Sequence, residues 1–97
     1  MKVLVMFAEE REWNGRQFRD VQYFKPMQSE NEPGRKGVRA LTVRGTAESM
    51  KSILAQPLPA MFDVDFGARP NFKGDPETSL VAAKLVKGVK VADLVPV

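Results

Sequence analysis

Residues 11–25 read "REWNGRQFRDVQYFK", and the Asn14-Gly15 pair within them gives the strongest indication of the fold. A two-residue Asn-Gly connection favours a type I′ turn, because both central residues of that turn need a positive φ. An apolar run at residues 3–8 precedes the turn, and a second strand over residues 16–25 follows it and ends before Pro26. The stretch therefore predicts a β-hairpin.

The turn also predicts the register of this hairpin. Counting outward from the turn gives the cross-strand pairs Trp13–Arg16, Glu12–Gln17, Arg11–Phe18, Glu10–Arg19, Ala8–Val21 and Met6–Tyr23. Because side chains alternate between the two faces of a strand, one surface is expected to carry Arg11, Trp13, Arg16 and Phe18. Tyr23 lies on the opposite side and is expected in the core.

Beyond the hairpin, strand patterns alternate with exposed loops. We expect loops at residues 26–37 and 68–78, strands at 38–44 and 60–67, a short helix at 46–56, and a final apolar stretch at 80–97. The helix should have Thr46 as its N-cap and Met50, Ile53 and Leu54 on one face. The last stretch fits either a hairpin turning at Lys87-Gly88 or one long strand with a bulge at the glycine.

Five strands with one helix after the third match the five-stranded Greek-key OB barrel. The predicted fold is therefore all-β: a single OB-like barrel domain over residues 1–97, with a projecting β-hairpin and one short helix. An SH3-like barrel and an open meander fit the same order of elements.

The composition of the 97-residue chain indicates a globular binding protein. Hydrophobic residues make up 43% and charged residues 28%, which suits one folded domain. The chain has no cysteine and no histidine, so it lacks the commonest general base and transition-metal ligand. We therefore expect no enzymatic activity and no cofactor. Asp63 and Asp65 are interpreted as the polar outer face of a strand, in preference to a Mg²⁺ site shared with Asp75 and Glu77.

The net charge of the chain indicates the kind of partner, and its N-terminal residues indicate the cellular compartment. The formal net charge is +3, a mild excess of cations that favours nucleic acid over acidic partners. The apolar run after Lys2 is too short to cross a membrane and lacks a small-residue cleavage site. We expect a cytoplasmic protein with no membrane partner.

The predicted hairpin surface carries rings and cations side by side. Bases can stack on Trp13 and Phe18, while Arg11 and Arg16 can reach phosphates. A simpler interpretation is that the rings cover an edge of the core and the arginines keep the hairpin soluble. Basic residues recur in both predicted loops, one of which also carries an aromatic residue. The candidate nucleic-acid contacts are Arg11, Trp13, Arg16, Phe18, Arg19, Arg35, Lys36, Arg39, Phe72 and Lys73.

Two strings, "NGRQFRDVQYF" at residues 14–24 and "VKVADLVPV" at residues 89–97, resemble a known family. They are similar to the helix-destabilising, gene V type single-stranded-DNA-binding proteins of filamentous bacteriophages. The hairpin motif of that family matches Arg11, Gly15, Arg16 and Phe18. Its loop aromatic matches Phe72, and its terminal motif matches Leu94, Val95 and Pro96.

The resemblance implies a homodimer that coats single-stranded DNA cooperatively and with little sequence preference. Such a protein serves phage genome replication and packaging in the cytoplasm of the host cell. Two other functions fit the residues themselves. One is a protein-interaction module of small-barrel type, and the other is an RNA-binding domain of OB or cold-shock-like type.

Overall fold

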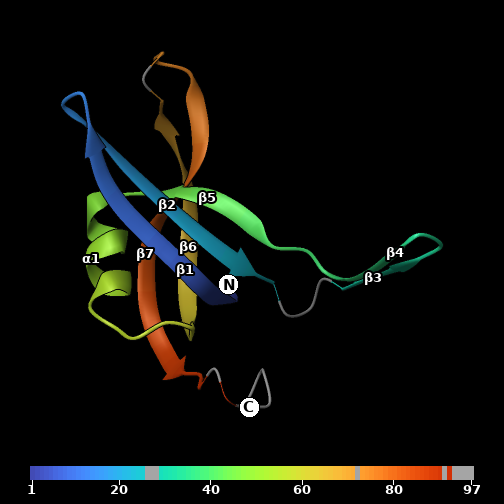
Figure 1. The fold of residues 1–97 in the computed structure, drawn as a ribbon. Coiled ribbons are helices and arrows are strands. Elements are labelled where there is room, and N and C mark those ends of the chain that lie inside the picture. The colour runs from blue at the N-terminus through green and yellow to red at the C-terminus, as the bar shows by residue number, and fades with distance from the viewer. Residues whose placement is uncertain (26–28, 72, 91, 93–97) are drawn as a thin grey trace.

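The computed structural model describes residues 1–25, 29–71, 73–90 and 92. Strands dominate it, with one helix after the fifth strand (Figure 1). In chain order the elements are β1 (Lys2–Trp13), β2 (Arg16–Phe24), β3 (Ser29–Glu32), β4 (Arg35–Val38), β5 (Leu41–Gly45), α1 (Ala47–Leu54), β6 (Ala60–Pro70) and β7 (Pro76–Gly88).

Five of the strands close into a barrel in the order β1-β2-β5-β7-β6, and β6 pairs again with β1. The pairing of β5 with β7 is parallel, whereas the other barrel pairings are antiparallel. Three barrel strands therefore precede the helix and two follow it. This arrangement confirms the predicted OB-like barrel, and closure of the sheet excludes the open meander.

The β1–β2 hairpin turns at Asn14 and Gly15, whose φ angles of 52° and 76° suit a type I′ turn. The predicted register is confirmed from the turn as far as Ala8 opposite Val21. The pair Met6–Tyr23 is wrong, because the register shifts between Val5 and Phe7 and Tyr23 lies opposite Val5. Met6 is the extra residue of a β-bulge, which the count from the turn could not include.

Residues 26–37 were expected to form an exposed loop, and the described part of this segment is instead a second hairpin. β3 and β4 make a separate two-stranded sheet that projects away from the barrel (Figure 1). The strand predicted over residues 38–44 is divided accordingly: Val38 ends β4, and β5 begins at Leu41. Pro and Gly residues concealed the short strands, because both residue types are common in loops and rare in strands.

The second predicted loop, at residues 68–78, is also mostly strand. β6 continues to Pro70 and β7 begins at Pro76, and their last pairs are Arg69 with Glu77 and Pro70 with Pro76. This β6–β7 hairpin therefore extends well past the core. The final apolar stretch is one long strand, so a hairpin at Lys87-Gly88 is wrong. The irregularities of its pairing lie at Val81 and Val86 and not at the glycine.

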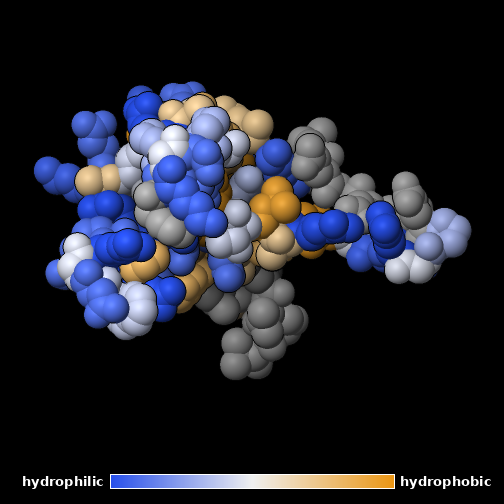
Figure 2. Space-filling view, turned by 90° about the horizontal axis from the view of Figure 1, so that it is seen from above, coloured by the Kyte–Doolittle hydropathy of each residue, from blue (hydrophilic) through white to orange (hydrophobic). Residues whose placement is uncertain are grey.

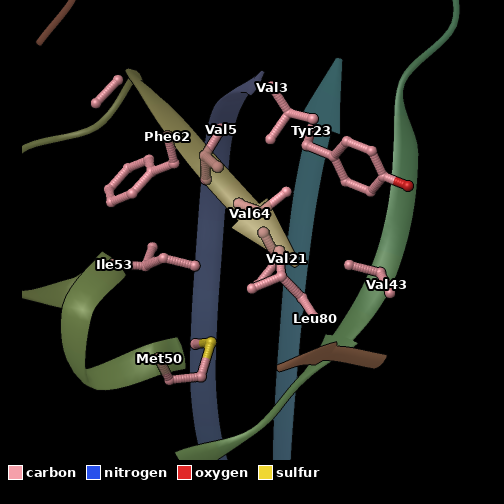
Figure 3. Close-up of a cluster of buried hydrophobic side chains, with 11 residues drawn as sticks. Val3, Val5, Val21, Tyr23, Val43, Met50, Ile53, Phe62, Val64 and Leu80 are labelled. Carbon is pink, nitrogen blue, oxygen red and sulfur yellow. The ribbon is translucent and has the colours of Figure 1, made fainter. Parts of the chain in front are cut away.

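Side chains from the barrel strands and from α1 fill the barrel interior (Figure 3). Phe62 and Leu80 are fully buried, and Met50 and Ile53 reach in from α1. Leu54 was expected on this same helical face but is 48% exposed at the end of the helix. Among the described residues, the buried core consists of Val3, Val5, Val21, Tyr23, Val43, Met50, Ile53, Ala60, Phe62, Val64 and Leu80.

Helix α1 begins where the sequence predicted. The backbone N–H of Ser49 donates to Thr46 Oγ1 at 3.3 Å, and the Thr46 N–H donates to Ser49 Oγ at 2.9 Å, which are the two reciprocal bonds of a capping box. Thr46 Oγ1 also donates to the carbonyl of Val81 at 3.3 Å, which ties the helix start to β7. Among the described residues, no helix has the length and apolar character needed to cross a membrane.

Gly45 connects β5 to this cap, and a larger residue does not fit there. A Cβ at Gly45 would lie 2.8 Å from Met50 Sδ and 3.0 Å from its Cγ, and Met50 is fully buried. We expect Gly45→Ala to lower the free energy of unfolding by about 1–3 kcal/mol, as overpacked cores do. Gly88→Ala is the matched control, because a Cβ there meets no atom within 4 Å. Urea denaturation of both variants measures the difference, and equal stabilities would contradict the steric argument.

Candidate nucleic-acid interface

The outer face of the β1–β2 hairpin carries an aromatic residue in water. Trp13 ends β1 opposite Arg16 and is 66% exposed, which is unusual for the largest apolar side chain. Phe18 lies two pairs further from the turn on the same face, opposite Arg11. The prediction that these four residues share one surface agrees with the register, and Trp13 does not cover the core.

The Phe18 ring contacts one guanidinium group from each neighbouring strand. The guanidinium carbon of Arg11 on β1 lies 5.5 Å from the ring centroid, and that of Arg44 on β5 lies 5.3 Å from it. Both distances are within the range of cation–π attraction. Because β2 runs between β1 and β5, the ring and the two cations form one continuous row across three strands.

Arg44 is not among the sequence-predicted contacts, because the sequence indicates it only as the end of a strand. Its position could have been found from alternation along β5. Val43 pairs with Val21 in the core, so Arg44 must point outward, beside Asp20 and on the same face as Phe18. What the sequence did not show is which strand lies beside β2, since that pairing spans about twenty residues.

A groove of about 840 Å³ opens beside this row. Its lining comes from the start of β2, the end of β5, the end of β6 and the start of β7. Figure 2 looks down on the hairpin ends from above, where hydrophilic residues predominate. Three arginines line the groove together with one carboxylate, so its lining carries more positive than negative charge. The charged lining residues are Arg16, Arg44, Arg69 and Glu77.

Carboxylates accompany the arginines of the outer face. Glu9 Oε1 lies 3.8 Å from Arg11 Nε, and Asp20 Oδ1 lies 3.7 Å from Arg44 Nε. Glu9 and Asp20 are themselves direct cross-strand partners. Both ion pairs are partly exposed to solvent, so each contributes little to stability and exchanges readily.

The remaining candidates lie elsewhere. Arg19 is on the opposite face of the hairpin, where its Nε lies 3.5 Å from Glu10 Oε2. Lys73 is in the β6–β7 turn, which the side chain of Asn71 organises by accepting the Lys73 and Asp75 N–H groups at 2.9 and 3.0 Å. Phe72 lies outside the described residues. Arg35, Lys36 and Arg39 line a hollow of about 260 Å³ at the β3–β4 hairpin. This hairpin projects away from the barrel (Figure 1).

The acidic residues considered for Mg²⁺ do not assemble into a site. Asp63 Oδ1 accepts a hydrogen bond of 2.9 Å from the N-terminal ammonium, which lowers the pKa of the carboxyl group. Across the described part of the chain, no group of three or more His, Cys, Asp or Glu side chains is arranged to hold a metal ion. Asp63 and Asp65 lie exposed on β6, as the interpretation of a polar strand face required.

The single tryptophan reports the local charge of this face. We expect iodide to quench Trp13 fluorescence more strongly than caesium, because Arg11 and Arg16 share its surface. Arg16→Gln should reduce that preference. Arg35→Gln removes the same charge from the distant β3–β4 hairpin and should leave the preference unchanged. Equal quenching by the two ions in the unmodified chain would contradict a positive surface at Trp13.

Comparisons of the chain with protein-family models, with curated proteins and with solved structures find no match. The function must therefore be argued from the hairpin face and the groove.

Proposed function

We propose that this protein binds single-stranded DNA and has no catalytic activity. The observation that carries the proposal is the row of Arg11, Phe18 and Arg44 beside the exposed Trp13, next to a groove lined by arginines. Rings and guanidinium planes both stack on bases, and the guanidinium groups also bind phosphates. One short surface thus offers both contacts that a nucleotide needs.

The same surface favours an unpaired strand over a duplex. The faces of the bases are hidden in a duplex, so Trp13 and Phe18 could contribute little to binding one. In a single strand each stacked base adds roughly 1–3 kcal/mol, nearly regardless of which base it is. Low sequence preference follows, because stacking and phosphate contacts do not depend on the edges of the bases.

Cations outside the groove extend the proposed surface. The β3–β4 hairpin brings Arg35, Lys36 and Arg39 to one side of the barrel, where they would contact phosphates further along the strand. Lys73 would act from the β6–β7 turn. Arg19 is the least suited of the proposed contacts, because it faces away and pairs with Glu10.

The resemblance to the gene V type proteins supplies the finer proposal. It adds a homodimer, cooperative coating of the strand, and a role in phage genome replication and packaging. A twofold dimer would present two of these small surfaces to DNA, and adjacent dimers would add contacts along the strand.

Titration with poly(dT) tests the proposal directly. Trp13 fluorescence should be quenched as the strand binds, since a base then stacks on the ring. The logarithm of the binding constant should fall by about 0.7 for each phosphate contact per tenfold rise in salt. Unchanged emission at saturating poly(dT) and low salt would exclude the role of Trp13. Oligo(U) of equal length decides between DNA and RNA, and binding of neither strand would leave the protein-interaction module as the better function.

Phe18 can be tested against Phe7, an exposed aromatic residue of the same sheet. Phe18→Ala should weaken poly(dT) binding by about 5- to 150-fold, the equivalent of losing one stacked base. Phe7→Ala is the matched control. Phe7 is half exposed on β1, further from the hairpin turn than Arg11, and it lies outside the row of Arg11, Phe18 and Arg44. Circular dichroism checks that both variants are folded. Equal losses in the two variants would contradict the specific role of Phe18.

A further inference from the structure

Two carboxylates lie directly opposite each other on the outer face of the hairpin. Glu9 and Asp20 are cross-strand partners, and like charges in that position destabilise a sheet. Their side chains are 44% and 32% exposed, so solvent softens the repulsion without removing it. The pair therefore has an energetic cost that the sheet itself does not explain.

Each carboxylate is close to one arginine of the row formed by Arg11, Phe18 and Arg44. Glu9 lies 3.8 Å from Arg11, and Asp20 lies 3.7 Å from Arg44. The same two guanidinium groups contact the Phe18 ring. Each arginine thus contacts the Phe18 ring on β2 and also has a carboxylate on the same face of the sheet.

From this arrangement we propose that Glu9 and Asp20 compete with phosphate for Arg11 and Arg44 and so limit the affinity for the bound strand. The inference rests on the proposed function and identifies two residues that set its strength. When a phosphate takes Arg44, Asp20 loses the cation beside it and faces Glu9 without compensation. When a phosphate takes Arg11 instead, Glu9 on β1 loses the cation beside it and faces Asp20 without compensation.

Competition of this kind keeps a coating protein removable. Removal of either carboxylate leaves its arginine free for phosphate and abolishes the like-charge contact. Glu9→Gln and Asp20→Asn should each tighten binding by about two- to fivefold, the range expected for an exposed ion pair. The double variant should combine both gains. Both changes relieve repulsion, so the variants should melt no lower than the unmodified protein.

The test uses two probes, oligo(dT) and an inorganic polyphosphate chain without bases. Asp65→Asn is the control, because it makes the same change of charge on the exposed outer face of β6, outside the groove lining. The proposal expects Glu9→Gln and Asp20→Asn to bind both probes more tightly, and Asp65→Asn to change binding by a smaller factor.

The outcomes separate this inference from the proposed function. If the unmodified protein binds oligo(dT) and the two variants bind it equally or more weakly, competition by the carboxylates is overturned. If no form binds oligo(dT) but the variants bind polyphosphate more tightly than the unmodified protein, the competition stands and single-stranded DNA binding is overturned. If the variants bind neither probe more tightly than Asp65→Asn does, the carboxylates have no specific effect on the arginines.

Discussion

Closure of the barrel depends on a short parallel pairing between β5 and β7. Arg44 lies beside Ser79 and Gly45 beside Leu80, and the Thr46 N–H donates to the carbonyl of Leu80 at 3.1 Å. This contact fixes the end of β5, starts α1 and directs the outward side chain of Arg44 toward Phe18. It also brings the β6–β7 hairpin across from β2, which creates the groove. The candidate interface is therefore a consequence of how the barrel closes.

The hairpins continue past the core, and this explains the chemistry of their surfaces. Near the turn, β1 and β2 pair only with each other, and residues 10–17 are all exposed. An aromatic ring at such a position stays in contact with water. Cations beside the ring partly compensate, because cation–π contacts and the alkyl stems of arginine cover part of its surface. The row of Arg11, Phe18 and Arg44 is thus stable without a ligand. Its exposed arginines can still leave the ring or their carboxylates to contact a ligand.

The sequence predicted the features that depend on local chemistry. Asn14-Gly15 set the register of the first hairpin, and Thr46 marked the helix start, because turns and caps are decided within a few residues. The bulge at Met6 could not be counted from the turn, since an extra residue leaves no local mark. The β3–β4 strands were hidden by Pro33 and Gly34, and the place of Arg44 required knowing that β5 lies beside β2. Long-range pairing therefore accounts for most of what was missed.

Burial distinguishes two kinds of carboxylate–arginine pair on a single hairpin. Glu10 and Arg19 face one side, and the arginine side chain there is only 26% exposed, so separating the pair would leave a charge with restricted access to water. Glu9 and Arg11 face the other side, and that arginine is 59% exposed, so phosphate or water can replace the carboxylate at little cost. Neighbouring residues of identical type thus differ in their access to solvent. A formal net charge of +3 cannot show this difference; exposure of each guanidinium can.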